Sequence, residues 1–163
     1  MRHPDVIRMI ASIYEPHTYL ELGLYEGETF NIVRPFCHRA IGVDINPVSL
    51  NGEIHKKTTD EFFETFNDKI DMAFIDADHK YESAKKDFEN CLSRLNYGGI
   101  ILMHDVDPIR DELFDFGYCG DSYRLVDDLE AREDINISTL PVHEEGLCLI
   151  TKVKDTRCHK RKS

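Results

Sequence analysis

Short apolar runs alternate with longer stretches of helical periodicity along nearly the whole chain. This alternation is typical of a parallel sheet whose two faces are covered by helices. Five of the apolar runs predict buried strands, and the third of these runs is the weakest. They are residues 17–22, 40–44, 53–57, 70–75 and 100–103.

The stretches with helical periodicity predict a helix before or between most of these strands. We expect Asn46 and Pro47 to cap and start one helix, because asparagine accepts from free amides and proline lacks the amide that would stay unpaired. Thr58 and Glu61 form a capping box for the next helix. In the longest stretch a single apolar stripe faces the sheet, and residues 97–99 end the helix. The predicted helices are residues 1–15, 27–35, a segment from 46–47, 58–66, 81–95 and a segment from Ser122.

The last two apolar runs, residues 135–140 and 147–150, are joined by a short loop through Gly146. Strands joined so closely must be antiparallel, because a parallel connection needs about a dozen residues or more. The sequence therefore predicts an α/β, doubly wound, seven-stranded and mostly parallel sheet with a C-terminal antiparallel hairpin. The 163 residues fit one such domain, residues 1–152, followed by a basic tail, residues 153–163, that we expect to be flexible.

The charge and the cysteine content of the chain limit the classes of binding partner and the cellular compartment that we expect for it. Asp and Glu number 31 against 20 Lys and Arg, and the formal net charge of -11 repels phosphate backbones, so we expect no nucleic-acid partner. No apolar stretch approaches the roughly 18 residues of a membrane span, so we expect no membrane insertion. The five cysteines form no CxxC pair, which favours a reducing, cytoplasmic setting.

The first predicted strand ends in the segment ELGLYEG, residues 21–27, where an acidic residue precedes two glycines. Glycine lets the backbone turn sharply and approach a ligand closely. In open α/β sheets, ligands bind at the carboxyl ends of strands where the strand order reverses. The acids Glu21 and Glu26 would disfavour a phosphate and suit a cationic ligand with an amino group, unlike the dinucleotide motif GxGxxG. An ordinary tight turn at Gly23 and Gly27 is the alternative.

The segment ELGLYEG resembles motif I of class I S-adenosylmethionine-dependent methyltransferases, which has the pattern acidic-x-Gly-x-x-x-Gly. The predicted sheet with its antiparallel hairpin also matches the fold of that family. The resemblance implies that Asp44, at the end of the second strand, holds the ribose of this cofactor and that Asp60 lies near its adenine amino group. Each acid could instead cap the helix that follows it. The implied cofactor-binding residues are Glu21, Gly23, Tyr25, Gly27, Asp44, Asp60 and Asp76.

The segment from the fourth strand to HDV resembles small methyltransferases related to sugar and antibiotic O-methyltransferases. In metal-dependent relatives the first acid of D-x-x-H binds a divalent cation and the histidine is the base, which implies catalytic roles for Asp76 and His79. Methyl transfer to a hydroxyl needs such a base because the oxygen must lose its proton. His104 and Asp105 occupy the positions of the other two metal ligands. A histidine there disfavours Mg²⁺ and favours Mn²⁺ or Fe²⁺, or no metal.

A plainer interpretation of these residues stays open. Asp76, Asp78 and Asp105 could be polar ends of buried strands, with His104 a hydrogen-bonded histidine at the sheet edge. Asp78 could also cap the long helix that begins near Tyr81. Two other functions compete with methyl transfer: a non-catalytic module that binds S-adenosylmethionine, and a nicotinamide-dependent oxidoreductase, which would need GxGxxG and parallel final strands.

The methyl acceptor implied by the resemblance is a hydroxyl of a small molecule or glycan. Residues 107–121, which include Phe114, Phe116 and Tyr118, are the expected substrate wall, although these aromatic residues could equally serve packing. So short a chain leaves its site open, which is compatible with a large acceptor or with a homodimer.

Overall fold

The computed structural model describes residues 1–115 and 117–153, and these form a single seven-stranded sheet in the order β3-β2-β1-β4-β5-β7-β6. The strands β1 to β5 run parallel, whereas β7 is antiparallel to both β5 and β6. The predicted fold class is therefore confirmed. The strands are β1 Thr18–Leu22, β2 Arg39–Asp44, β3 Glu53–Lys56, β4 Ile70–Ile75, β5 Leu95–His104, β6 Ile135–Leu140 and β7 Leu147–Lys152.

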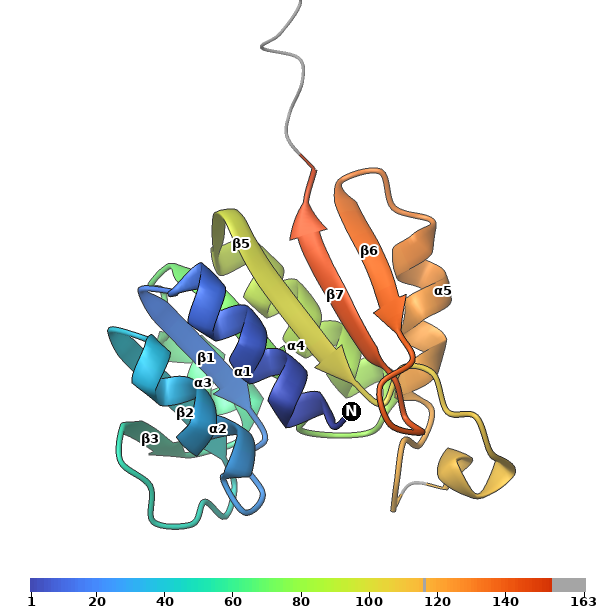
Figure 1. The fold of residues 1–163 in the computed structure, drawn as a ribbon, viewed down its shortest axis with the longest axis horizontal. Coiled ribbons are helices and arrows are strands. Elements are labelled where there is room, and N and C mark those ends of the chain that lie inside the picture. Colours follow the sequence, from blue (N-terminus) through green and yellow to red (C-terminus); the bar gives the residue numbers. More distant parts are fainter. Residues whose placement is uncertain (116, 154–163) are drawn as a thin grey trace, which may run out of the picture.

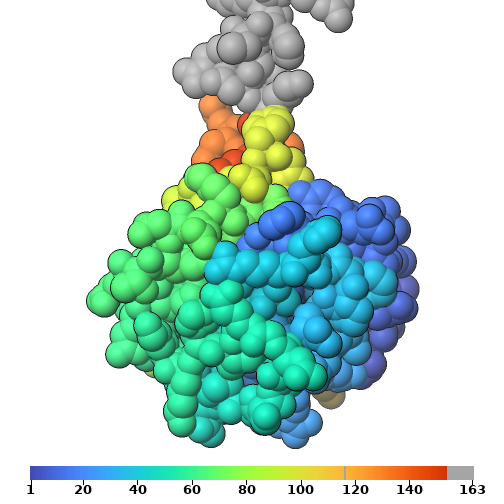
Figure 2. Space-filling view, turned by 90° about the vertical axis from the view of Figure 1, so that its left-hand side faces the viewer, coloured from blue at the N-terminus to red at the C-terminus, as the bar shows by residue number. Residues whose placement is uncertain are grey.

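Helices cover both faces of the sheet, with α1 and α2 on one face and α3 and α4 on the other (Figure 1). Seen from the β3 edge, the blue and cyan residues of α1 and α2 lie on one side of the molecule and the green residues of α4 on the other (Figure 2). The helices are α1 His3–Tyr14, α2 Glu28–Val33, α3 Thr59–Thr65, α4 Tyr81–Arg94 and α5 Leu125–Glu130. Short 3-10 turns are Arg34–Phe36, Asp111–Phe114 and Ser122–Arg124.

Each face of the sheet has its own apolar core. Tyr19, Phe30 and Phe74 are buried beneath α1 and α2. Leu20 and Phe88 belong to the core beneath α3, α4 and α5. Every residue of β1 is buried, including the polar Thr18 and Glu21, because helices cover both faces of this strand. Burial of each large apolar side chain contributes about 1.5–3 kcal/mol to the free energy of folding. The two cores together therefore hold the strand ends in fixed positions.

Residues 46–47 do not start a helix, and the prediction there was wrong. The Oδ1 atom of Asp44 accepts a hydrogen bond from the amide of Asn46 at 2.7 Å, so the chain forms a turn here and no helix. Aspartate side chains compete in this way with helical hydrogen bonding. Leu50, farther along the same segment, packs against the core beneath α1 and α2. Tertiary packing and one local hydrogen bond therefore override the capping signal.

The strand β5 begins at Leu95, not at residue 100 as predicted, and α4 ends at Arg94. Residues 97–99, which we expected to end the helix, are part of the strand. Gly98 has φ +82°, and the pairing of β4 with β5 shifts register between Ile70 and Met72. A glycine inside a strand commonly marks such a bulge. Residues 97–99 therefore belong to an irregular part of β5 and do not end α4.

The remaining predictions about the chain have mixed outcomes. The capping box of Thr58 and Glu61 is confirmed at the start of α3. Within the described residues, no helix combines the length and the apolar character needed to cross a membrane. The predicted tail lies outside the described residues from position 154 onward, so the domain boundary and the flexibility of the tail stay predictions.

Candidate active site

Two adjoining cavities open at the carboxyl ends of the parallel strands. The sheet order reverses between β1 and β4, which is the position where open α/β sheets bind ligands. The first cavity, about 600 Å³, includes Asp60 in its lining, and the second, about 680 Å³, includes His79. Gly23, Asp44 and neighbouring residues line both of them, so a single elongated ligand could reach from one cavity into the other.

The loop after β1 is built on two glycines with positive φ. Gly23 has φ +85°, and a Cβ atom on it would lie 2.0 Å from the backbone oxygen of Asp76. Gly27 has φ +75°, and a Cβ atom there would lie 2.6 Å from a side-chain carbon of Leu50. Between them, Tyr25 also has a positive φ, +47°, and its side chain is exposed. The close approach of the loop to β4 therefore requires glycine at position 23 and is more than an ordinary tight turn.

Asp44 ties the glycine loop to the end of β2. Its Oδ2 atom accepts from the amides of Leu24 at 2.8 Å and Tyr25 at 3.3 Å. Because no helix follows Asp44, the helix-capping alternative is wrong. Its Oδ1 atom also accepts from the amide of Asn46, so about one of the roughly four acceptor positions of the carboxylate is left for a ligand in the cavities.

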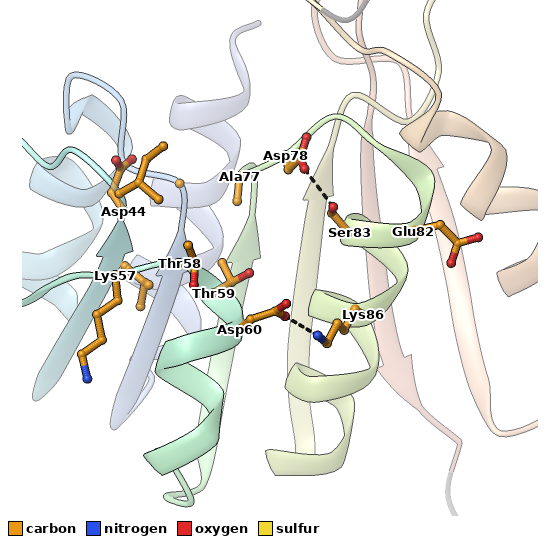
Figure 3. A pocket seen from close by; sticks show the side chains of 13 residues that line it. Asp44, Lys57, Thr58, Thr59, Asp60, Ala77, Asp78, Glu82, Ser83 and Lys86 are labelled. Atoms are coloured by element: carbon orange, nitrogen blue, oxygen red, sulfur yellow. Dashed lines mark hydrogen bonds and ion pairs between the residues drawn. The ribbon is translucent and has the colours of Figure 1, made fainter.

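The first cavity lies between the ends of β2 and β3 on one side and α4 on the other (Figure 3). Asp60, in the first turn of α3, pairs with Lys86 of α4 at 2.7 Å beside this cavity. Asp78 accepts from the hydroxyl of Ser83 at 2.8 Å and does not cap α4 through a backbone amide. The amide of Tyr81 is instead satisfied by the Oδ1 atom of Asp121 at 2.7 Å, from a loop far along the chain.

Glu21 lies behind the glycine loop, in the interior of the protein. Its residue is 1% exposed, and its carboxyl group accepts a hydrogen bond from the Tyr19 hydroxyl at 2.5 Å. Burial raises the pKa of Glu21 to about 8, against the opposite effect of this hydrogen bond, and the nearby Asp76 carboxylate raises it further. The structure thus places six of the seven predicted cofactor residues around the loop and the cavities, with Glu21 buried beneath them.

The second cavity brings together the residues predicted for catalysis. The Nε2 atom of His79 lies 3.1 Å from a carboxylate oxygen of Asp105 and 3.9 Å from one of Asp76. The backbone oxygen of His79 accepts from the amides of Asp121 and Ser122, which fixes the loop after β4. His79 keeps 30% of its side chain exposed, so its ring can reach a ligand in the cavity.

His104 is almost fully enclosed, with 7% of its side chain exposed. Its Nδ1 atom lies 3.5 Å from Asp76 and 3.2 Å from Asp105. Burial alone would lower the pKa of His104, but the carboxylates of Asp76, Asp105 and Glu145 outweigh burial and raise it to about 9. A protonated histidine is no metal ligand, so a metal bound here would displace a proton.

Asp105, which the sequence predicted, contacts side chains of this cluster that the sequence did not single out. Asp105 has φ +59°, its side chain accepts from the thiol of Cys119 at 3.4 Å, and its backbone oxygen accepts from the Ser122 hydroxyl at 3.0 Å. Glu145 lies 3.5 Å from Nε2 of His104. Cys119 and Glu145 lie in irregular loops outside any motif, so no pattern in the sequence pointed to them.

His3 is the most unexpected member of the cluster. The first turn of α1 places its ring 3.9 Å from that of His104 and 5.8 Å from that of Phe74, measured between centroids. Burial and the neighbouring His104 lower the pKa of His3 to about 4. A histidine beside a proline at a helix start carries no functional signal in the sequence.

Among residues 1–115 and 117–153, two trios of side chains place one metal-binding atom each within 4.8 Å of one another. His3, Asp76 and His104 form the first, and Asp76, His79 and Asp105 form the second. The predicted ligands Asp76, His104 and Asp105 are therefore close together but distributed over both trios.

The expected substrate wall divides into residues that reach the cavity and residues that do not. Tyr118 lines the second cavity and is 56% exposed. Phe114 packs edge-on against Tyr123, with ring centroids 5.0 Å apart, and lines a separate hollow beside α5. Phe116 lies outside the described residues.

Comparison with known protein families assigns the chain to one of them. Residues 20–106, more than half of the chain, match a family described as a methyltransferase domain, Methyltransf_24. The chain belongs to this family. The matched region includes the glycine loop, Asp44 and the segment from Asp76 to Asp105, so the motifs that predicted the family lie within it.

One curated relative of this methyltransferase-domain chain is the uncharacterized protein R132 of Acanthamoeba polyphaga mimivirus, 25% identical over 134 residues. The match covers 66% of this chain and 61% of that protein, so the chain spans less than two thirds of the length of its relative.

Several solved structures share the fold, among them two O-methyltransferases. Cofactor-bound Rv0187 from MTB has a TM-score of 0.78 and 15% identity, covering 91% of this chain and 78% of that one. An O-methyltransferase of Bacillus cereus, in complex with SAH, has a TM-score of 0.72 and 14% identity, with coverages of 92% and 80%. TomG of Streptomyces achromogenes, in complex with SAM, has a TM-score of 0.74 and 15% identity, with coverages of 93% and 79%. These likenesses confirm the predicted methyltransferase fold.

Proposed function

We propose that this chain binds S-adenosylmethionine across the two cavities and transfers its methyl group to a hydroxyl of a small molecule or sugar. The observation that supports this most is the glycine loop, held by Asp44 at the reversal of the sheet order and open to both cavities. The methyltransferase family and the absence of GxGxxG from the sequence favour this function over a nicotinamide-dependent oxidoreductase. The neighbours named as O-methyltransferases support a hydroxyl acceptor.

In this proposal the adenosine occupies the first cavity and the sulfonium faces the second. Asp44 accepts from a ribose hydroxyl, and Asp60 lies near the adenine amino group. The glycine loop, with Tyr25, encloses the methionine part of the cofactor, and Asp76 lies next to the sulfonium. Glu21 acts from behind the loop, where its buried carboxyl group supports the end of β1.

The chemical step is an in-line displacement with His79 as the base. The acceptor oxygen forms a bond to the methyl carbon, the bond between carbon and sulfur breaks with its electron pair going to sulfur, and the hydroxyl proton passes to His79. Asp105, 3.1 Å from Nε2 of His79, would stabilise the imidazolium that results. A divalent ion, Mg²⁺, Mn²⁺ or Fe²⁺, held by Asp76, His104 and Asp105, would lower the pKa of the acceptor hydroxyl.

The proposal also includes a cytoplasmic location, an acceptor other than nucleic acid, and a homodimer. The net charge of -11 disfavours a nucleic-acid acceptor, and Cys91, Cys119 and Cys148 are buried free thiols, as expected in the cytoplasm. A homodimer would give the open second cavity an additional wall, and light scattering tests for it.

Calorimetric titration of the purified chain with S-adenosylmethionine tests cofactor binding. We expect Asp44→Ala to abolish measurable binding, because it removes both the ribose acceptor and the hydrogen bonds that hold the glycine loop. Unchanged affinity in this variant, or no affinity in the native chain, refutes the cofactor site.

Formation of S-adenosylhomocysteine with a panel of hydroxylated acceptors tests catalysis. His79→Ala should retain cofactor affinity and lose about 100-fold or more in kcat, the usual contribution of a general base. Cofactor binding without turnover in the native chain, with no effect of His79→Ala on any activity, would support the non-catalytic module instead.

A further inference from the structure

The N-terminal helix delivers a second histidine to the cluster at the end of β5. His3 is in the first turn of α1, and Val6 and Ile7 of the same helix are buried in the core beneath it, which fixes the position of that turn. The rings of His3 and His104 are in direct contact, with centroids 3.9 Å apart. The position of His3 is therefore set by the packing of a whole helix and not by a mobile side chain alone.

His104 has a buried nitrogen atom that the protein leaves unsatisfied. Its side chain is 7% exposed, and Nε2 has no hydrogen-bond partner among the residues that the structure describes. A buried polar atom without a partner costs about 1–3 kcal/mol, so each such atom in a native protein needs an explanation. The carboxylate of Glu145 lies 3.5 Å from Nε2 without forming a hydrogen bond, and an ion bound at Nε2 would supply the missing partner.

We propose that His3, His104 and Asp76 bind a divalent transition-metal ion of the Fe²⁺ to Zn²⁺ range in preference to Mg²⁺. One potential ligand atom of each residue lies within 4.8 Å of the other two. Two imidazoles and one carboxylate form a donor set suited to Fe²⁺ or Zn²⁺, whereas Mg²⁺ demands oxygen ligands. The inference does not rest on methyl transfer.

Asp105 has a different role in this site. Its carboxylate already faces three donors, the thiol of Cys119, Nε2 of His79 and Nδ1 of His104. Histidines that bind metals commonly donate their second N–H to such a carboxylate, which orients the ring. In this site His3 therefore replaces Asp105 as the third ligand, and Asp105 is a positioning residue for His104. Glu145 adds a further negative charge 3.5 Å from Nε2.

The test uses the purified chain without a polyhistidine tag, treated with EDTA and freed of chelator. Calorimetric titration with Zn²⁺ and with Mg²⁺, both without S-adenosylmethionine, should give one Zn²⁺ site and no comparable Mg²⁺ site. His3→Ala should weaken Zn²⁺ binding by roughly 10- to 100-fold, as loss of a donor or its supporting contact does in metal proteins. The visible spectrum of bound Co²⁺ should lose intensity in the same variant.

Two control variants separate this site from other histidine sites. His79→Ala removes the second trio, which shares Asp76, and should leave Zn²⁺ affinity close to that of the native chain. His17→Ala removes an exposed histidine that stacks on His38 near the opposite ends of the strands, and it should leave both affinity and stoichiometry unchanged. His3→Gln, in which the side chain keeps its approximate size, should match His3→Ala, and circular dichroism establishes that each variant folds.

Native Zn²⁺ affinity in His3→Ala and His3→Gln overturns the proposal. Loss of the ion in His79→Ala but not in His3→Ala overturns it as well, because the second trio would then be the metal site. Titration of each variant with S-adenosylmethionine is a separate measurement, so failure of the metal site and failure of the cofactor site are distinguishable.

Discussion

The first cavity and the second cavity share a wall, but the charged groups around them are in different environments. In the first, the side chains of Asp60 and Lys86 are 56% and 59% exposed. In the second, the side chains of His104 and Asp105 are 7% and 8% exposed. Solvent screens exposed charges, whereas buried charges interact strongly. We therefore expect the charged side chains of the first cavity to act mainly as hydrogen-bond partners of the ligand, and those of the second to act through electrostatics.

The largest expected effect comes from the backbone that forms the shared wall. Gly23→Ala places a Cβ atom 2.0 Å from the backbone oxygen of Asp76 at φ +85°, so the loop must move away from β4. We expect a loss of about 3 kcal/mol or more in the free energy of unfolding, together with loss of binding to S-adenosylmethionine. Urea denaturation and calorimetric titration measure the two effects.

Gly98→Ala is the matched control for this substitution. Gly98 has nearly the same φ, +82°, but a Cβ atom on it would meet nothing within 4 Å. Only the strain of a positive φ remains, which costs about 1–2 kcal/mol, and cofactor affinity should not change. Equal losses in the two variants would mean that backbone strain, and not the contact with β4, makes glycine necessary at position 23.

The second effect concerns the buried carboxyl group behind the glycine loop. The pKa of Glu21 is raised from 4.5 to about 8 in the folded protein, so the folded state holds this proton more tightly than the unfolded state does. Its contribution to stability is fully present below about pH 4.5 and is lost as the pH rises through 8. Each tenfold difference in proton affinity between the two states is equivalent to about 1.4 kcal/mol, so the loss amounts to several kcal/mol.

Glu21→Gln should remove this part of the pH dependence, because glutamine stays neutral throughout. Urea denaturation between pH 4.5 and 8 compares it with the native chain. Glu26→Gln, at an exposed position of the same loop, should leave the slope unchanged. A slope that is the same in all three proteins would mean that the charge of Glu21 is solvated and that electrostatic effects of burial are confined to the second cavity.

Some residues of the second cavity could be predicted from the sequence, and others could not. The apolar runs that end at Ile75 and Met103 mark two parallel strands, and because parallel strands end at one edge of a sheet, Asp76, His79 and Asp105 meet there. His3 was not predictable, because its place depends on where α1 packs across the sheet. The contacts of Asp121 and Cys119 come from an irregular loop without periodicity.

In the first cavity the local signals were less reliable than the strand pattern. The strands β2 and β4 follow directly from their apolar runs, because burial on both faces leaves no polar position in their centres. The capping signal at residues 46–47 failed, since the Asp44 carboxylate took the amide of Asn46. The side chain of Asp44 is held in this orientation by the amides of Leu24 and Tyr25 in the loop after β1, a long-range contact that the local sequence pattern does not show.

A smaller effect tests whether the exposed ion pair of the first cavity recognises the cofactor. Asp60→Asn and Lys86→Gln both break the pair of Asp60 with Lys86, which is largely exposed and contributes about 0–1 kcal/mol to stability. Only Asp60→Asn changes the proposed partner of the adenine amino group. We expect it alone to weaken binding of S-adenosylmethionine, by roughly 5- to 10-fold, equivalent to about 1 kcal/mol. Equal affinities in the two variants would leave Asp60 with a structural role only.

The smallest effect concerns the aromatic residues beside the second cavity. Tyr118 lines that cavity and Phe114 instead packs on Tyr123, so their substitutions should affect different quantities. We expect Tyr118→Ala to raise the KM for the acceptor by about twofold to fivefold without a change in melting temperature, because it removes a partly exposed contact surface. Phe114→Ala should lower the melting temperature slightly and leave the KM unchanged. If both variants change the KM equally, the second cavity extends past Tyr118 toward α5, and the acceptor is larger than the cavity between the glycine loop and Glu145.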